Sequence, residues 1–260
     1  MSGFLTEMGR LSQLRADRLD SVDLARRVEG LPTPPQIDTS TFGVIAEIKF
    51  SAPSVGVLRS DSDPIQAAVD QARVYEDAGA RAISVLTEPT RFAGDLDHLE
   101  SVADAVGLPV MRKDFLVQPT QVLEARAFGA AGVLLIVRML DDETLAAMVG
   151  QAEALGMFVL LEAFDEADLD RSARFPQALI GLNCRDLQTL QVQPSRFGSL
   201  SAAFPPGRIQ VAESGLESVA AVESVYGMGY GMVLVGSALM KANDPSSLLR
   251  EMASVGRNSV

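Results

Sequence analysis

The sequence is poor in cysteine and histidine, with one of each, Cys184 and His98, among its 260 residues. A single cysteine excludes an intramolecular disulfide, and the N-terminus lacks the apolar core of a secretory signal. We therefore expect a cytoplasmic protein. So few soft ligands also argue against a zinc site, and we expect no metal.

Long apolar runs and excess positive charge are also missing. No stretch approaches the roughly 18 uninterrupted apolar residues of a membrane span. The formal net charge is −12, because 34 Asp and Glu outnumber 22 Lys and Arg. An acidic surface repels phosphate-rich partners, so we expect neither a nucleic acid nor a membrane as partner. Small anions are not excluded, because they respond to local charge.

Eight short apolar runs recur along the chain. They are rich in Val, Ile and Leu, too short for helices and nearly continuous, which is typical of strands buried on both faces. The runs are residues 44–49, 82–87, 109–113, 132–137, 157–162, 178–183, 209–213 and 232–236. Helical patterns lie between them, for example at 63–80, 120–130 and 140–156, and several end at Gly-Ala or Leu-Gly, a helix-stop signal.

This alternation predicts an α/β fold, a single (β/α)8 TIM barrel over residues 44–260. Residues 1–43 are predicted to form an N-terminal helical extension and a Pro-rich linker, because residues 31–42 carry three prolines in a polar stretch. An open doubly wound sheet is the alternative. The barrel is favoured because the runs number eight and no nucleotide fingerprint follows the first one.

Polar and charged side chains stand at the C-terminal side of five runs. In the first run Glu47 and Lys49 are two residues apart and so share a face, whereas Ala46 and Ile48 point the other way. The other polar residues of this kind are Lys113, Glu162, Asn183, Arg185 and Glu213. The carboxyl ends of TIM-barrel strands carry the active site. Because burying ions is costly, we interpret the cluster as catalytic rather than structural.

Two loops indicate a phosphate site. AESGL (212–216) and VGSAL (235–239) follow the seventh and eighth runs, and each offers a glycine, small residues and free backbone amides. TIM barrels commonly bind phosphate with these two loops. We expect a small phosphorylated substrate, held by Ser214, Gly215, Gly236 and Ser237 with Lys49 nearby.

Longer segments resemble a known family. These are AEIKFSAPSVGVLRSD, AISVLTEPTRFAGDLDHL, LPVMRKDFLVQPTQVLEARAFGA, LLEAF, IGLNCRDL, VAESGL and LVGSALM. From about residue 44 to residue 245 they resemble, in order, the indole-3-glycerol phosphate synthase family. The resemblance implies a carboxy-lyase of tryptophan biosynthesis that converts 1-(2-carboxyphenylamino)-1-deoxyribulose 5-phosphate to indole-3-glycerol phosphate, CO₂ and water. It implies no metal and no organic cofactor.

The resemblance also implies roles for individual residues. Lys113 is implied as the general acid of ring closure, and Glu162 and Lys49 as assistants in dehydration. Glu47 and Glu213 would position the lysines and the substrate hydroxyls. The remaining implied substrate-binding residues are Asn183 and Arg185 for the anthranilate part, Phe92, Phe115, Leu134 and Leu187 for the aromatic pocket, and Ser54 in the first loop.

Three features depart from the family pattern. Ala52 replaces a serine, a loss of one neutral hydrogen bond worth roughly 0.5–1.5 kcal/mol that Ser51 is expected to offset in part. Asp95 replaces another serine and is expected to bring negative charge near the anionic ligand. The segment before residue 44 is short and proline-rich, where family members carry a helix that helps to cover the mouth.

These departures keep alternatives open. One is a paralogue that acts on a related aryl-amino sugar phosphate in secondary metabolism. Another is a Schiff-base aldolase with Lys49 or Lys113 as nucleophile, and a third is a binding protein without catalysis. We expect a monomer or weak homodimer, with Cys184 and Arg112 in packing roles and His98 in a surface or packing role.

Overall fold

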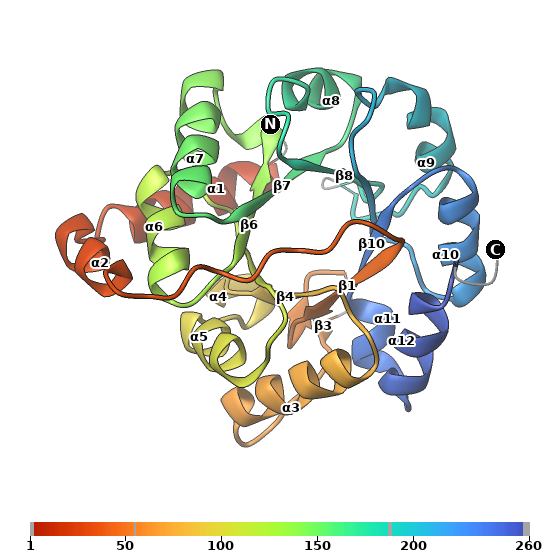
Figure 1. Cartoon of the computed structure of the whole chain (residues 1–260), viewed down its shortest axis with the longest axis horizontal. Coiled ribbons are helices and arrows are strands. Elements are labelled where there is room, and N and C mark those ends of the chain that lie inside the picture. Colours follow the sequence, from red (N-terminus) through yellow and green to blue (C-terminus); the bar gives the residue numbers. More distant parts are fainter. Residues whose placement is uncertain (1–2, 55, 187–188, 257–260) are drawn as a thin grey trace.

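The computed structural model describes residues 3–54, 56–186 and 189–256. Eight parallel strands form a closed barrel in the order β1-β10-β9-β8-β7-β6-β5-β4, which confirms the predicted fold (Figure 1). The strands are β1 (Gly43–Ile48), β4 (Ala82–Leu86), β5 (Val110–Lys113), β6 (Gly132–Ile136), β7 (Phe158–Ala163), β8 (Leu179–Asn183), β9 (Gln210–Glu213) and β10 (Met232–Val235).

Helices surround the barrel. They are α3 (Pro64–Asp77), α4 (Pro89–Phe92), α5 (Leu96–Ala105), α6 (Pro119–Ala127), α7 (Asp142–Ala154), α8 (Glu166–Ser172), α9 (Ser195–Ser199), α10 (Val219–Gly227), α11 (Ser237–Lys241) and α12 (Pro245–Ala253), with 3-10 turns η1 (Val137–Met139) and η2 (Ser201–Ala203). Side chains such as Asp63, Asp141 and Asp244 accept hydrogen bonds from first-turn amides, which sets where each helix begins.

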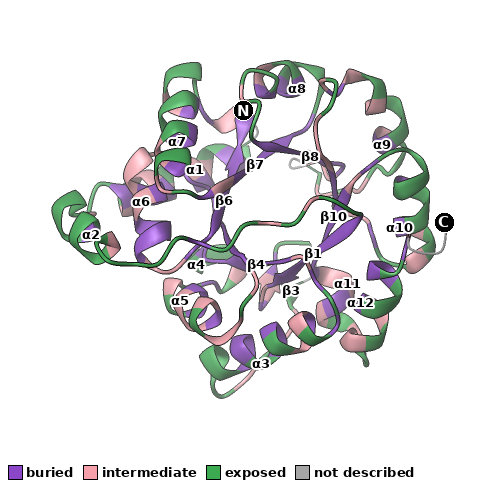
Figure 2. Ribbon diagram, in the orientation of Figure 1, coloured by how far each residue is buried: buried purple, intermediate pink, exposed green. Residues whose placement is uncertain are grey.

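The strands are buried on both faces, as their continuous apolar runs predict (Figure 2). Outward residues such as Val44 and Ile83 pack against the helices, whereas Ile45, Met111 and Leu160 fill the barrel interior. The apolar filling occupies the interior below the carboxyl ends of the strands, and the charged side chains Glu47, Lys113, Glu162 and Glu213 gather at that end.

The N-terminal extension touches both ends of the barrel. Helix α1 (Gly3–Ala16) lies at the carboxyl ends of the strands, where its Arg15 pairs with Asp114 directly after β5. Helix α2 (Ser21–Val28) packs against α6. The proline-rich segment then crosses the amino ends of the strands, where Asp38 pairs with Arg81 (Figure 1). The expectation that this chain lacks a helix covering the mouth was therefore wrong, because α1 is the cover.

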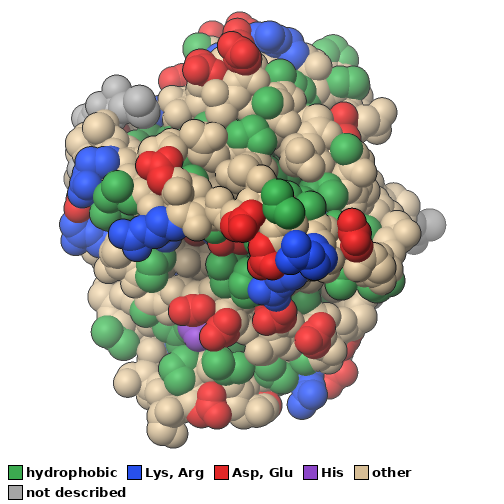
Figure 3. Space-filling model, turned by 90° about the vertical axis from the view of Figure 1, so that its left-hand side faces the viewer, with side chains coloured by type: hydrophobic (Ala, Val, Ile, Leu, Met, Phe, Trp, Pro, Cys, Tyr) green, Lys and Arg blue, Asp and Glu red, His purple; other side chains and the backbone are tan. Residues whose placement is uncertain are grey.

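The loop after β1 folds back as a small hairpin. Its two short strands, β2 (Ser51–Ala52) and β3 (Gly56–Val57), pair antiparallel at the barrel mouth. In the part of the chain that the structure describes, no helix has the length and apolar character needed to span a bilayer. The face that carries α2 mixes acidic and basic side chains with scattered apolar ones (Figure 3).

Candidate active site at the mouth of the barrel

A pocket opens at the carboxyl ends of the strands and encloses about 1060 Å³, including solvent at its mouth. A concave site with apolar walls and a few converging polar groups is typical of pockets that bind small organic molecules. The pocket is lined by Glu47, Lys49, Ser54, Phe92, Lys113, Phe115, Leu134, Glu162, Asn183, Arg185, Glu213, Ser214, Gly215, Gly236 and Ser237. These are all the predicted site residues except Leu187, which lies outside the described residues.

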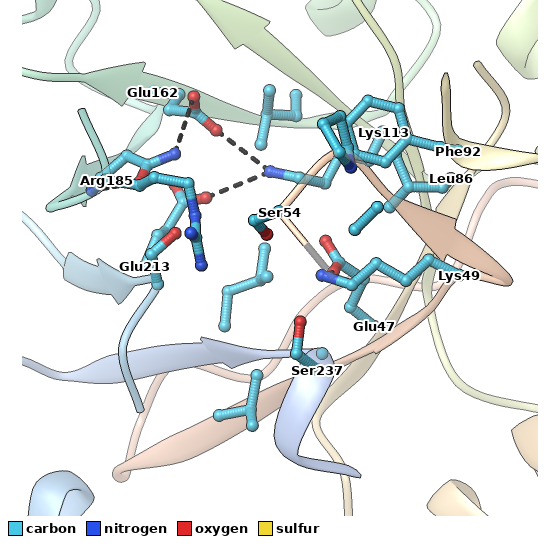
Figure 4. A pocket seen from close by; sticks show the side chains of 18 of the residues that line it. Glu47, Lys49, Ser54, Leu86, Phe92, Lys113, Glu162, Arg185, Glu213 and Ser237 are labelled. Atoms are coloured by element: carbon cyan, nitrogen blue, oxygen red, sulfur yellow. Dashed lines mark hydrogen bonds and ion pairs between the residues drawn. The ribbon is translucent and has the colours of Figure 1, made fainter. Parts of the chain in front are cut away.

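Lys113 lies between two carboxylates at the floor of the pocket. Its Nζ donates to Glu162 Oε2 at 3.0 Å and to Glu213 Oε2 at 3.3 Å (Figure 4). Lys113 and Glu213 are the last residues of β5 and β9, and Glu162 is the last but one of β7, so the closed barrel brings the three together across its axis. Burial by itself lowers the pKa of Lys113, but the carboxylates of Glu162, Glu213 and Glu47 outweigh it and raise the pKa above its ordinary value. Lys113 is therefore a protonated ammonium group at neutral pH.

A second pair, Glu47 and Lys49, lies on the other side of the Lys113 ammonium group (Figure 4). Lys49 Nζ is 2.5 Å from Glu47 Oε1, and Glu47 is only 2% exposed. Burial acts to raise the pKa of Glu47, but Lys49 and Lys113 together hold it below the ordinary carboxyl value. Glu47 is thus an ionised group that fixes the position of Lys49.

Asn183 links the carboxylate of Glu162 to the Arg185 loop. Its Nδ2 donates to Glu162 Oε1 at 3.2 Å, while its Oδ1 accepts from the Arg185 backbone amide at 2.9 Å. The Arg185 guanidinium donates to the carbonyl of Leu190 at 2.8 Å and faces the pocket. Glu162 therefore has one oxygen on Lys113 and the other on Asn183, which fixes its orientation.

Glu213 is a carboxyl group that favours its protonated form. It is 1% exposed, and its Oε1 has no hydrogen-bond partner in the described part of the chain. Burial is the main cause that raises its pKa, to about 8, with Glu162 adding to the effect and Lys113 opposing it. Glu213 therefore keeps its proton to a higher pH than an ordinary carboxyl group, and in the protonated form it can donate a hydrogen bond as well as accept one.

This shifted carboxyl predicts a dependence of stability on pH. The folded protein binds the Glu213 proton more tightly than the unfolded chain does. This proton binding therefore adds to the free energy of unfolding at low pH, and the added stability is lost as pH rises toward about 8. We expect Glu213→Gln to lose less stability than the wild type between pH 5 and pH 9, measured by urea unfolding. The exposed Glu223→Gln is the matched control. Parallel curves for wild type and Glu213→Gln would contradict the raised pKa.

Two strand or loop glycines make room for the buried carboxylates. A Cβ atom on Gly181 would lie 2.0 Å from Glu213 Oε1, and one on Gly236 would lie 2.1 Å from Glu47 Oε1. The Gly236 position would also be 3.0 Å from Lys49 Nζ. Lys49 therefore lies beside the loop after β10. This is one of the two loops for which the sequence predicts phosphate binding with Lys49 nearby.

The loops after β9 and β10 form one side of the pocket. Ser214 and Gly215 both have positive φ, at 70° and 72°, so two successive residues turn the chain sharply after β9. Ser237 begins α11 directly after Gly236. The four predicted phosphate-binding residues all line the pocket together with Lys49.

The opposite wall is apolar and includes residues that the sequence did not reveal. Phe115 packs edge-on against Phe4 of α1 at a centroid distance of 5.8 Å, and its ring is tilted against that of Phe92 at 6.0 Å. Leu86 and Ile136, at the ends of β4 and β6, also line the pocket, and Leu190, Leu216, Leu234 and Val235 are apolar lining residues on the side of β8, β9 and β10. Alternation along β4 could have revealed Leu86, but no local pattern shows that Phe4 reaches this wall.

Two expectations about the departures from the family pattern need correction. Asp95 caps α5 by accepting from the Asp97 amide at 2.9 Å and faces a different cavity, so it adds no charge to the mouth. The Ser51 hydroxyl donates to the carbonyl of Gly56 at 3.2 Å and also lies outside the pocket, so it cannot replace a hydroxyl at position 52. Ala52 itself does line the pocket.

Three other residues have the packing roles that were predicted. Arg112 donates to Glu124 of α6 at 2.7 Å, so it meets the helix layer. Cys184 is buried in the outer core, and His98 packs against Phe50 with ring centroids 5.1 Å apart. Among the described residues, no group of three or more His, Cys, Asp or Glu side chains is placed to hold a metal ion.

Fold and site together define a (β/α)8 barrel with paired lysines and glutamates at its mouth, opposite an apolar wall and beside two small-residue loops. The family model of indole-3-glycerol phosphate synthase matches residues 11–252. The chain belongs to this family. The indole-3-glycerol phosphate synthase of Mycobacterium leprae is 45% identical over 215 residues, 83% of this chain and 78% of that protein. The Mycobacterium tuberculosis protein of the same name is 39% identical over 256 residues, 95% and 93% of the two chains.

Solved structures with little sequence identity share the fold. The 3-hexulose-6-phosphate synthase of Salmonella typhimurium has a TM-score of 0.67 at 14% identity, covering 82% of this chain and 97% of that one. The phosphoribosylanthranilate isomerase of Thermotoga maritima has a TM-score of 0.56 at 14% identity, with coverage of 82% and 98%. At this identity the likeness concerns the fold alone.

Proposed function

We propose that the protein converts 1-(2-carboxyphenylamino)-1-deoxyribulose 5-phosphate to indole-3-glycerol phosphate, CO₂ and water in tryptophan biosynthesis. The observation that carries this proposal is the Lys113 ammonium group held between Glu162 and Glu213 at the floor of the pocket. Membership of the indole-3-glycerol phosphate synthase family supports it. The proposed mechanism uses side chains of the pocket for every proton transfer.

The two ends of the pocket suit the two ends of this substrate. The phosphate is assigned to the amides and hydroxyls of Ser214, Gly215, Gly236 and Ser237, with the Lys49 ammonium beside them. The aromatic ring is assigned to the apolar wall around Phe115, and its carboxylate to Arg185. Binding at both ends holds the ring carbon near the carbonyl carbon, which makes ring closure an intramolecular reaction in a fixed geometry.

Ring closure needs a proton donor at the carbonyl oxygen. The ring carbon that bears the carboxylate attacks the carbonyl carbon, and Lys113 donates its proton so that the oxygen becomes a hydroxyl group. The carboxylate then leaves as CO₂, and its bonding electrons restore the aromatic ring. Poor solvation by the apolar wall favours this loss of charge.

Dehydration completes the reaction. The hydroxyl group leaves as water when an acid protonates it, and a base removes a proton from the neighbouring methylene carbon to form the double bond of the indole ring. Lys49 and Glu162 lie on different sides of Lys113 and are assigned to this step (Figure 4). A positioned acid or base typically contributes about 10²–10⁴-fold to the rate.

The test is a fluorescence assay that follows the formation of indole-3-glycerol phosphate from this substrate by the wild-type protein. We expect turnover without added cofactor. A well-folded protein that binds the substrate without turnover would instead support the non-catalytic binding protein. A protein that turns over only a different aryl-amino sugar phosphate would support the paralogue. Of the two positions that depart from the family pattern, Ala52 lines the pocket and Asp95 does not.

A Schiff-base aldolase is disfavoured by the charge around Lys113. A lysine nucleophile needs a lowered pKa so that it reacts as a free amine. The carboxylates around Lys113 raise its pKa instead. Borohydride reduction in the presence of substrate is expected to leave the mass of the protein unchanged, and a stable adduct on Lys49 or Lys113 would favour the aldolase.

Three coarser properties complete the proposal. We assign residues 1–43 to an extension and residues 44–260 to the barrel, and we place the protein in the cytoplasm because its one cysteine forms no intramolecular disulfide. We assign a monomer or weak homodimer because the exposed large apolar side chains are spread over α1, α2, β3, α3 and α10. Analytical ultracentrifugation tests the last assignment, and a dimer that persists at nanomolar concentration would contradict it.

A further inference from the structure

A buried polar cluster lies directly behind Lys113. Arg112 and Asp114 flank Lys113 in the sequence and point to the opposite face of β5, where their side chains are 2% and 0% exposed. Arg112 donates to Thr87 Oγ1 at 3.0 Å, to Glu124 Oε2 at 2.7 Å and to Asp114 Oδ2 at 3.2 Å. The end of β5 is therefore held from behind by a charged network.

Asp114 joins this network to helix α1. Its Oδ2 accepts from Thr87 and Arg112, and its Oδ1 accepts from the Phe115 amide and from Arg15 of α1, both at 2.7 Å. Because the carboxylate is fully buried, each of these donors offsets the cost of its desolvation. Without Arg15, the cation that still pairs with Asp114 is Arg112, whose guanidinium group also pairs with Glu124.

One face of α1 contacts the stretch of chain after β5 and, through Arg15, also Glu88 after β4 at 3.8 Å. Phe4, Met8, Ser12 and Arg15 follow helical spacing and so lie along one side of the helix. Phe4 packs on Phe115, and Ser12 accepts a hydrogen bond from Gln121 at 2.9 Å. The ion pair of Arg15 lies three residues beyond Ser12 on α1, and its partner Asp114 directly follows Lys113.

We propose that Arg15 is a positioning residue for Lys113, which acts by pairing with Asp114 and thereby couples the docking of α1 to proton transfer at the mouth. This inference rests on the proposed function, because Lys113 is the general acid there. A general acid must lie within hydrogen-bond distance of the oxygen that it protonates. A misplacement of about 1 Å, caused by a change away from the reacting atoms, can cost about 10²-fold in rate.

The test compares two arginines of the same helix. Arg15→Met keeps the side-chain length and removes the ion pair with Asp114 together with a longer one, of 3.8 Å, to Glu88. Arg10→Met makes the same change at an exposed position whose side chain shows no ion pair or hydrogen bond among the described residues. We expect Arg15→Met to lower kcat about tenfold and to change KM less than about threefold, since substrate binding is retained while the acid is displaced. Arg10→Met is expected to match the wild type.

Two further variants separate positioning from stability. Arg15→Lys keeps a cation near Asp114, so it is expected to recover most of the lost kcat. Asp114→Asn weakens the same pair, and adding Arg15→Met to it is expected to lower kcat no further. Thermal unfolding of each variant shows which of them are folded at the assay temperature, and Arg15→Lys keeps the test available if Arg15→Met is not.

The outcomes distinguish this inference from the proposed function. An inactive wild-type protein would contradict the proposed function and remove the basis of the inference. An active wild type with unchanged kcat in folded Arg15→Met would overturn the inference alone. Independent, multiplicative losses in the double variant would also overturn it, because Arg15 would then not act through Asp114.

Discussion

Lys113→Ala is expected to lower kcat by about 10³- to 10⁴-fold while the protein still binds the product indole-3-glycerol phosphate. The substitution removes the ammonium group that lies between Glu162 and Glu213, and with it the proton for the carbonyl oxygen. The loss corresponds to about 4–5.5 kcal/mol of activation free energy. The measurement is single-turnover indole fluorescence, with product binding followed by titration.

Two lysine variants sharpen this prediction. Lys113→Arg keeps a cation between the carboxylates, but a guanidinium group does not release its proton near neutral pH, so kcat is expected to stay low. Lys241→Ala changes the remaining lysine of the chain, which is exposed at the end of α11, and is expected to keep wild-type kcat. Turnover by Lys113→Arg close to that of the wild type would mean that the charge, not the proton, matters at this position.

Much of the fold was predictable because burial on both faces leaves a mark in the local sequence. The continuous apolar runs located all eight strands to within a residue or two, and period-two alternation placed Glu47 and Lys49 on one face. The same reasoning placed Arg112 and Lys113 on opposite faces of β5. In a closed parallel barrel the carboxyl ends meet at one mouth, so knowing the strand ends was enough to assemble the polar cluster.

The remaining features depend on contacts between distant segments. Arg15 and Asp114 are 99 positions apart, and neither neighbourhood carries a pattern that specifies the pair. Strands β2 and β3 have two residues each, too few for any periodicity. Asp95 was misplaced because its carboxylate caps α5, a local hydrogen bond that competes with any longer-range role.

Glu162→Gln is expected to lower the steady-state rate of indole-3-glycerol phosphate formation about 10²-fold. It is also expected to delay formation of the indole ring relative to CO₂ release. The oxygen of the Gln amide can still accept a hydrogen bond from Lys113, so ring closure retains its acid, whereas its NH2 group faces the Asn183 Nδ2 donor and that hydrogen bond is lost. The amide cannot remove the methylene proton, so dehydration loses its base. The ring-closed, decarboxylated hydroxyl compound should therefore accumulate on the enzyme during the first turnover.

Rapid quenching with parallel measurement of CO₂ and indole tests this order of events. In the wild type the two products should appear together within the first turnover, whereas in Glu162→Gln a burst of CO₂ should precede indole. Lys113→Ala should delay both, because it blocks the first bond formation. Glu166→Gln, at an exposed glutamate at the start of α8, is the matched control and should behave as the wild type. If CO₂ and indole slow equally in Glu162→Gln, then Glu162 acts before decarboxylation, and the proton of dehydration must leave through another group at the mouth.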